Sequence, residues 1–253
     1  MKSRVHTTAV VFRRSNAGAW VHVLATGAVI YVRASNLWHV MPGHVVTVDV
    51  RLRGHVGGML LAEGTVSEPR VDVPALGLPP LKVLERDSIR IAGANVEVKT
   101  YKMEQVLPAL ENIIDPIWAA IHCNRHGDRR AAIVLLQDVL GKDLRCLDAH
   151  AHLGNLVFPT FPAHALLHYE IGIAIGDYAL GAGFTGALPW SYLENRPFLR
   201  CLHSQALALW RLNRTEEAAH VFERLLRLNP ADGQGAKQNL ADLQAGCDWE
   251  DNV

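Results

Sequence analysis

The segment RCLHSQALALWRLNRTEEAAHVFERLLRLNP, residues 200–230, decides how the carboxy-terminal half of the chain folds. Apolar residues recur every three or four positions on both sides of Asn213, which is the spacing of two amphipathic helices. Pro230 ends the second helix because proline cannot continue the helical hydrogen-bond ladder. The segment therefore predicts two antiparallel helices, packed through the small side chain of Ala218 and the aromatic ring of Phe222.

The same step from a small to a large apolar residue occurs twice upstream. Ala165 is followed by Tyr169, and Ala132 is followed by Leu136. Ala132 and Ala165 lie 33 residues apart, close to the period of about 34 residues that is typical of tetratricopeptide repeats. Ala165 and Ala218 lie 53 residues apart, so the second repeat carries an insertion of roughly 19 residues. The pattern predicts three helical hairpins.

The insertion maps to GDYALGAGFTGALPWSYLEN, residues 176–195, which is rich in glycine and aromatic residues. A long loop inside a compact helical array is more often functional than neutral. The register is supported by Leu153 and Gly154, which match the leucine–glycine pair of the repeat, and a last helix at 235–246 is expected to cover the apolar end of the stack.

The segment from Pro189 onward also carries a family resemblance. It is similar to the carboxy-terminal module of a group of bacterial tetratricopeptide-repeat proteins of unassigned role, over roughly residues 148–250. The residues that carry the resemblance are Pro189, Trp190, Asn195 to Arg200, Trp210, Glu216 to Ala218 and Leu228 to Gly235. The resemblance implies a fold and no particular chemistry.

The amino-terminal part follows a different period. Apolar and polar residues alternate in VHTTAVVF, WVHVLAT, AVIYVR, HVVTVDVRLR and GMLLAEGTV, with glycine, asparagine and proline between them. Five short strands are predicted, with a short helix or a loop at 34–43 between the third and fourth. The strand number and this placement favour a small barrel of the OB type.

These patterns predict an α+β protein of two domains, an OB-like β-barrel followed by an all-α stack of tetratricopeptide-like hairpins. The barrel is placed at residues 1–68, and a proline-rich connector with a possible hairpin at 69–101. The helical domain is placed at 102–250, where helix-spaced segments begin with MEQVLPALENII.

Composition narrows the function classes. The chain has 253 residues, 49% of them hydrophobic, with 25 basic and 25 acidic residues, so no global field attracts a polyanion. The four cysteines are far apart, which favours reduced thiols in the cytoplasm. The first residues lack the apolar run of a signal peptide, and no segment has membrane-spanning length. A cytoplasmic protein without a membrane partner is expected.

A partner-binding groove is predicted along the first helix of each hairpin. On the helix expected over 199–212, the face opposite the packing positions is taken to be the groove. Asn155 is the matching position one repeat earlier, and an asparagine beside an arginine and a histidine resembles a peptide-carboxylate clamp. The predicted contact residues are Asn155, Trp190, Asn195, Arg196, Arg200, His203, Trp210 and Arg211.

The barrel offers an alternative site for single-stranded nucleic acid. OB folds bind oligonucleotides by stacking bases on aromatic rings in a basic groove. The candidate residues are Arg13, Arg14, Trp20, Arg33, Arg51 and Arg53, with Phe12, Tyr31 and Trp38 as further rings or as core. Few basic residues on a chain of zero net charge make a weak electrostatic footprint.

Metal and catalytic patterns are weaker. His164 and His168 share a helix face, but HALLH lacks the glutamate of a zinc-protease motif, and His122, Cys123 and His126 lack a fourth ligand. GAGFTG at 181–186 lacks the strand before it that a dinucleotide loop needs. No metal, cofactor or catalytic residue is therefore predicted. The expected function is a non-catalytic adaptor that binds a protein or peptide, and the alternative is nucleic-acid binding by the barrel.

The repeat assignment generates a stability test at Ala218. A leucine at this position would overfill the close contact between the two helices of the last hairpin, so Ala218→Leu is expected to cost about 1–3 kcal/mol. Urea unfolding followed by circular dichroism measures the change. Unaltered stability would contradict the predicted helix packing.

Overall fold

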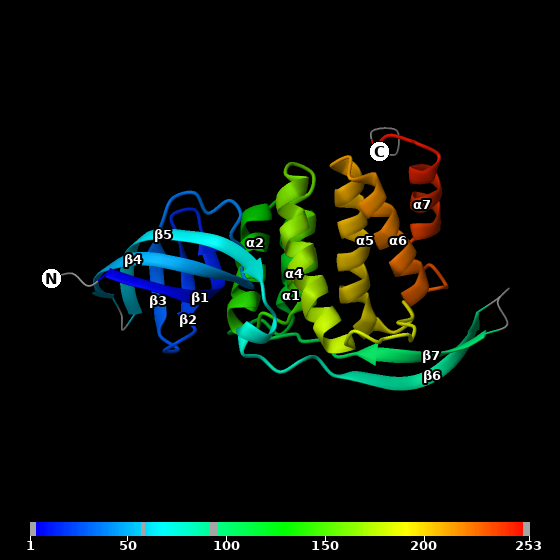
Figure 1. Ribbon diagram of the computed structural model, residues 1–253, viewed down its shortest axis with the longest axis horizontal. Coiled ribbons are helices and arrows are strands. Elements are labelled where there is room, and N and C mark those ends of the chain that lie inside the picture. Colours follow the sequence, from blue (N-terminus) through cyan, green and yellow to red (C-terminus); the bar gives the residue numbers. More distant parts are fainter. Residues whose placement is uncertain (1–3, 57–58, 92–95, 250–253) are drawn as a thin grey trace. The chain divides into compact units, whose positions relative to one another are not determined.

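The computed structural model describes residues 4–56, 59–91 and 96–249 (Figure 1). The chain divides into two compact units. The first combines Met1–Pro79 with Leu107–Ala149, and the second combines Pro80–Val106 with His150–Val253. The units thus differ from the predicted domains, because two helices group with the barrel and the predicted connector hairpin groups with the later helices. The predicted Gly–Gly turn at 57–58 and the hairpin tip at 92–95 lie outside the described residues.

The first unit contains the five predicted strands, closed into a barrel in the order β1-β2-β3-β5-β4. Neighbours pair antiparallel except β3 and β5, which run parallel. The strands are β1 (Arg4–Ser15), β2 (Gly18–Val23), β3 (Val29–Arg33), β4 (His44–Val56) and β5 (Met59–Val71). The barrel core consists mainly of valines, which suit a pleated surface because their branched side chains pack well on it.

The segment at 34–43 is an irregular loop with turns, so the helical option there is not realised. Leu37 and Val40 from this loop belong to the barrel core. Trp38 between them is 52% exposed, which corrects the idea that it fills the core. The backbone of Asn36 has φ +65°, a conformation that asparagine tolerates better than most residues.

Strand β5 runs past its predicted end at residue 66 and includes Pro69. Its pairing with β4 shifts register between Val45 and Thr47, and Glu68 opposite the shift has φ +52°. Such a bulge leaves a residue out of the ladder, so the missing N–H of Pro69 costs no strand hydrogen bond.

The first unit also contains α1 (Pro116–Arg125) and α2 (Arg129–Lys142), which pack against each other. The Asp115 carboxylate accepts from the Trp118 N–H at 2.9 Å and caps α1. Asp128 caps α2 in the same way, accepting from the Ala131 N–H at 2.9 Å.

The stretch MEQVLPALENII does not form a helix, which corrects that prediction. Met103 belongs to a strand, and the residues after it have irregular structure. Leu110 and Ile113 exchange backbone hydrogen bonds across a tight turn, in which Asn112 has φ +62°. Pro108 lacks the N–H that a helix interior requires, so the apolar spacing alone did not produce a helix.

The second unit contains the later helices, α4 (Pro162–Leu180), α5 (Arg196–Arg211), α6 (Thr215–Leu228) and α7 (Ala236–Gln244). They pack in sequence order, α4 on α5, α5 on α6 and α6 on α7 (Figure 1). The division between the units falls within α3 (Leu147–Val157). In the part of the chain that the structure describes, α4 is the longest helix, and no helix combines the length and apolarity needed to cross a membrane.

Packing in the second unit follows the predicted small and aromatic positions. Ala165, Tyr169, Ala218 and Phe222 are fully buried. The backbone of Gly154 lies against the Tyr169 ring, and a β-carbon built on Gly154 would stand 2.2 Å from the ring carbon Cε1. Glycine is therefore needed there for close approach of the two helices.

The hairpin of β6 (Val83–Ile91) and β7 (Val96–Met103) completes the second unit. The predicted hairpin is thus present, and its second strand continues past residue 101 to Met103. It is joined to the segment after the inserted glycines, because Ala187 receives a bond from the Tyr101 N–H and donates one to the Lys99 carbonyl, both at 2.8 Å.

The Gly154–Tyr169 contact and helix propensity predict opposite effects of an alanine at position 154 on the stability of the protein. Alanine normally stabilises a helix interior by up to about 1 kcal/mol over glycine. Gly154→Ala should instead destabilise the protein by about 1–3 kcal/mol, because the new methyl group overlaps the Tyr169 ring. Gly141→Ala on α2 is the control, since a β-carbon there meets no atom within 4 Å. Chemical unfolding that shows stabilisation by both substitutions would contradict the close approach.

Candidate functional site

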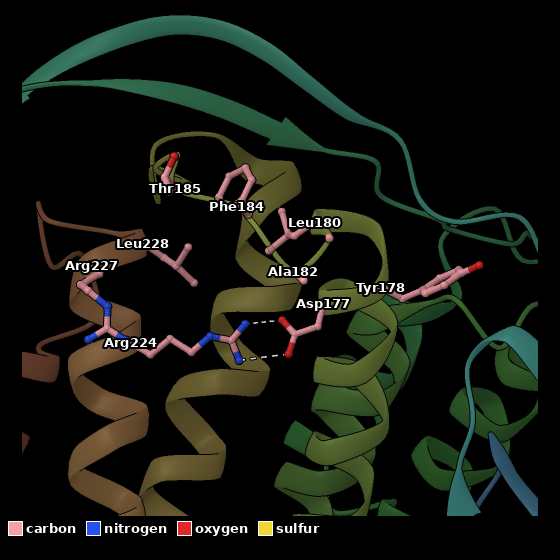
Figure 2. Close-up of a pocket in the computed structure, with 11 residues that line it drawn as sticks. Asp177, Tyr178, Leu180, Ala182, Phe184, Thr185, Arg224, Arg227 and Leu228 are labelled. Atoms are coloured by element: carbon pink, nitrogen blue, oxygen red, sulfur yellow. Dashed lines mark hydrogen bonds and ion pairs between the residues drawn. The ribbon is translucent and has the colours of Figure 1, made fainter.

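A pocket of about 790 Å³ lies where the inserted loop meets the carboxy-terminal ends of α4 and α6 (Figure 2). Three groups of residues line it, from α4, from the loop and from α6. They are Asp177, Tyr178 and Leu180; Gly181, Ala182, Phe184, Thr185 and Gly186; and Arg224, Arg227 and Leu228. The pocket lies entirely within the second unit.

The predicted insertion forms this pocket in two steps. Its first residues, 176–180, extend α4, which corrects the expectation of a loop starting at residue 176. Gly181, with φ +75°, then ends the helix, and its N–H donates to the Asp177 carbonyl at 2.9 Å. A glycine suits this position because side chains strain a left-handed backbone.

The far end of the loop is held by the hairpin and by α6. The ring centroids of Phe184 and Tyr101 lie 5.1 Å apart in an edge contact. The Tyr101 ring also occupies the space that a β-carbon on Gly186 would need. The Leu188 N–H donates to the Leu228 carbonyl at 2.6 Å, so the loop also binds the last turn of α6.

An ion pair crosses the pocket. Figure 2 shows the Arg224 side chain reaching from α6 to the Asp177 carboxylate on α4. Arg224 Nη1 lies 3.1 Å from Asp177 Oδ2, and Nη2 bonds Oδ1, so both carboxylate oxygens are engaged. Leu180, Phe184 and Leu228 supply apolar surface, whereas the Tyr178 ring points away from the ion pair (Figure 2).

The same loop also walls a second hollow of about 510 Å³, which Val83 and Tyr101 of the hairpin line from the other side. Leu180 and the loop residues around Phe184 line both hollows. The loop therefore contributes lining residues to both hollows.

Asn155, the predicted groove residue on α3, is bonded to two side chains outside the predicted groove set. Its Oδ1 accepts from the Tyr169 hydroxyl at 2.7 Å and from the Ser204 hydroxyl at 3.2 Å. Asn155 is exposed but its amide oxygen joins three helices, α3, α4 and α5. This oxygen is therefore engaged in holding the helices together.

Four other predicted groove residues bond other parts of the fold, and for Trp210 and Asn195 burial corrects their assignment as open contact residues, whereas His203 and Arg211 are half-buried. Trp210 is 3% exposed, and its indole N–H donates to the Cys247 carbonyl at 3.2 Å. Asn195 is fully buried. Arg211 bonds the carbonyls of Phe158 and Pro159, and His203 Nε2 contacts Asn239 Oδ1 at 3.0 Å. Burial lowers the pKa of the His203 imidazole.

Trp190, Arg196 and Arg200 form a cluster at the end of the insertion. Both guanidinium groups lie over the Trp190 ring, at 5.0 and 5.7 Å from its centroid. The Trp190 N–H donates to the Asn229 side chain at 3.1 Å, and Arg196 Nε donates to the Trp190 carbonyl at 3.0 Å. These contacts order the chain between the inserted loop and α5.

The barrel residues predicted for nucleic acid are partly neutralised. Arg13 lies over the Trp20 ring and pairs with Asp138 at 2.8 Å, and Arg53 pairs with Glu63 at 2.6 Å. Burial lowers the pKa of Arg14, which contacts the Val40 carbonyl. The remaining candidates, Arg33 and Arg51, are exposed. Paired arginines attract phosphate less than free ones, so the arrangement weakens the predicted basic groove.

The histidine clusters do not assemble metal sites in the described part of the chain, where no group of three or more His, Cys, Asp or Glu side chains converges. His150 and His168 are both buried, with ring centroids 6.2 Å apart. The His122 ring stacks on the exposed ring of Trp118, and the His126 ring stacks on His122.

Sequence reasoning located the inserted loop but missed the residues that complete its pocket. Asp177 was assigned to the loop, and Arg224 and Arg227 were absent from the predicted contacts. Their only available signal was position, since Arg224 and Arg227 precede the helix-ending Pro230 by about two turns and one turn, respectively. No family model matches the chain, and no curated protein matches it either.

The burial of Trp210 generates a prediction opposite to a groove role. Trp210→Ala removes a ring that packs on Trp249 and should lower the free energy of unfolding by about 3–5 kcal/mol. Leu193→Ala is a control in the same unit, because Leu193 is 60% exposed and its loss should change stability by less than about 0.5 kcal/mol. Urea denaturation measures both. A Trp210→Ala protein of unchanged stability would restore the groove assignment.

Proposed function

We propose that this protein is a non-catalytic interaction scaffold of the bacterial tetratricopeptide-repeat type, with an OB-like barrel at its amino terminus. The helix-pair resemblance supports the first part, together with the buried alanine and aromatic positions that such hairpins need. The closed order β1-β2-β3-β5-β4 supports the second, since an OB fold is a five-stranded Greek-key barrel. The composition favours a cytoplasmic location.

The observation that carries the binding role is the pocket of about 790 Å³ built by the inserted loop. The inserted loop is fixed by contacts at both of its ends, and the cavity lies between this loop and the ends of α4 and α6. Its volume lies within the range of about 300–1,000 Å³ that is usual for ligand sites. We place the partner segment in this pocket and assign the buried groove residues to fold stability.

The chemistry of the lining favours binding over catalysis. Among the eleven lining residues, Asp177 is the single carboxylate, and both its oxygens are bonded to Arg224. The hydroxyl groups come from Thr185 and Tyr178, and no lining side chain is a histidine or cysteine that could activate them. The same lining offers apolar area and cationic groups, which recognise a peptide.

The proposal is tested by crosslinking from the loop. A photoreactive amino acid at position 185, on the exposed rim of the pocket, should crosslink a partner protein in living cells. The same group at Gln238, exposed on α7 and outside the pocket lining, is the control. Phe184→Ala should reduce the crosslinked species from position 185 severalfold while the protein stays folded. Equal crosslinking from both positions, or none from 185, would refute binding at this pocket.

A further inference from the structure

We propose that the pocket recognises a peptide segment that presents a carboxylate next to an apolar side chain. This inference rests on the proposed function and names the chemistry of its partner. It draws on three features of the lining: an arginine without an acidic partner, two backbone N–H donors of the loop that bond no described residue, and an apolar patch.

The arginine is Arg227. The lining holds two arginines and one acid, and Asp177 is already bonded to Arg224 through both oxygens. Arg227 is exposed, and among the described residues no carboxylate lies within ion-pair distance of it. Figure 2 shows its guanidinium at the α6 side of the pocket, separate from the Arg224–Asp177 pair. A ligand carboxylate would supply the counter-charge in a charge-assisted hydrogen bond.

The backbone donors belong to the loop. Of the residues that line the pocket, Ala182 and Thr185 have N–H groups that make no hydrogen bond to any described residue, whereas the Gly181 N–H donates to the Asp177 carbonyl on α4 and the Phe184 N–H to the Gly181 carbonyl. Donors that are free at the wall of a pocket favour an acceptor ligand, because they would otherwise be only solvated.

The helix ends do not cancel this preference. Carbonyl groups at helix carboxy-termini disfavour anions. Here the Asp177 carbonyl accepts from the Gly181 N–H, and the Leu228 carbonyl accepts from the Leu188 N–H. The loop therefore satisfies two of the carbonyls at these helix ends, and Arg227 supplies the one charge in the lining that the Arg224–Asp177 pair leaves uncompensated.

The apolar patch consists of Leu180, Phe184 and Leu228. These side chains offer area to an aliphatic or aromatic group placed beside the carboxylate, and burying such area drives binding. A volume of about 790 Å³ accommodates a few residues, so a short segment fits and a folded partner surface does not. A chain end or an acidic side chain can supply the same carboxylate.

Two pairs of fluorescent hexapeptide pools distinguish these sources. One pair ends in leucine, as the free acid or as the amide. The other has blocked ends and a central Glu–Leu or Gln–Leu. Fluorescence anisotropy with the full chain should show binding at least tenfold tighter for one acid pool than for its neutral partner. Arg227→Gln should abolish that preference, and Phe184→Ala should weaken the acid and neutral pools alike.

Lys237→Gln is the charge-matched control, because Lys237 is exposed on α7 and does not line the pocket. It should keep the preference, and thermal unfolding verifies that all variants are folded. Equal affinity for acid and neutral pools would overturn the carboxylate inference while leaving the scaffold proposal intact. Loss of the preference in Lys237→Gln would overturn the inference too. Octanoate, an apolar carboxylate without a peptide backbone, is tested alongside, and its binding in the absence of binding by any peptide pool would also overturn it.

Discussion

The Asn195 side chain joins three segments on which the shape of the second unit depends. Its Oδ1 accepts from the Met103 N–H at 2.9 Å, and its Nδ2 donates to the carbonyls of Tyr101 and Pro189 at 2.9 and 3.1 Å. A buried amide must have its polar atoms satisfied, because an unpaired one costs about 1–3 kcal/mol. Asn195 thereby ties the hairpin to the end of the insertion and to the start of α5.

This link gives the inserted loop two fixed ends. On one side, α4 continues to Leu180 and stops at Gly181. On the other side, the chain after the loop is held by β7, by Asn195 and by the last turn of α6. A loop fixed in this way can keep a cavity open, since its apolar residues are already packed against Tyr101. The pocket is therefore a consequence of how the insertion is anchored.

The helices of this unit use their polar side chains mainly to hold one another. Asn155 bonds tyrosine and serine on neighbouring helices, and Arg211 bonds carbonyls at the end of α3. By contrast, Arg227 and the N–H groups of Ala182 and Thr185, which line the pocket, bond no described carboxylate or carbonyl. The proposed binding role therefore falls to the insertion, while the polar contacts between the helices contribute to stability.

The sequence by itself determined the local structure: five strands, the helix pairs around Ala165 and Ala218, and the place of the insertion. Those features follow from periodicity and from proline and glycine, which act over a few residues. Only the tertiary structure decided that Asp177 meets Arg224, 47 positions away, and that Trp210 is covered by Trp249. It also decided that α1 and α2 join the barrel's unit. Such contacts depend on how complete elements pack together, and no local pattern of residues records that packing.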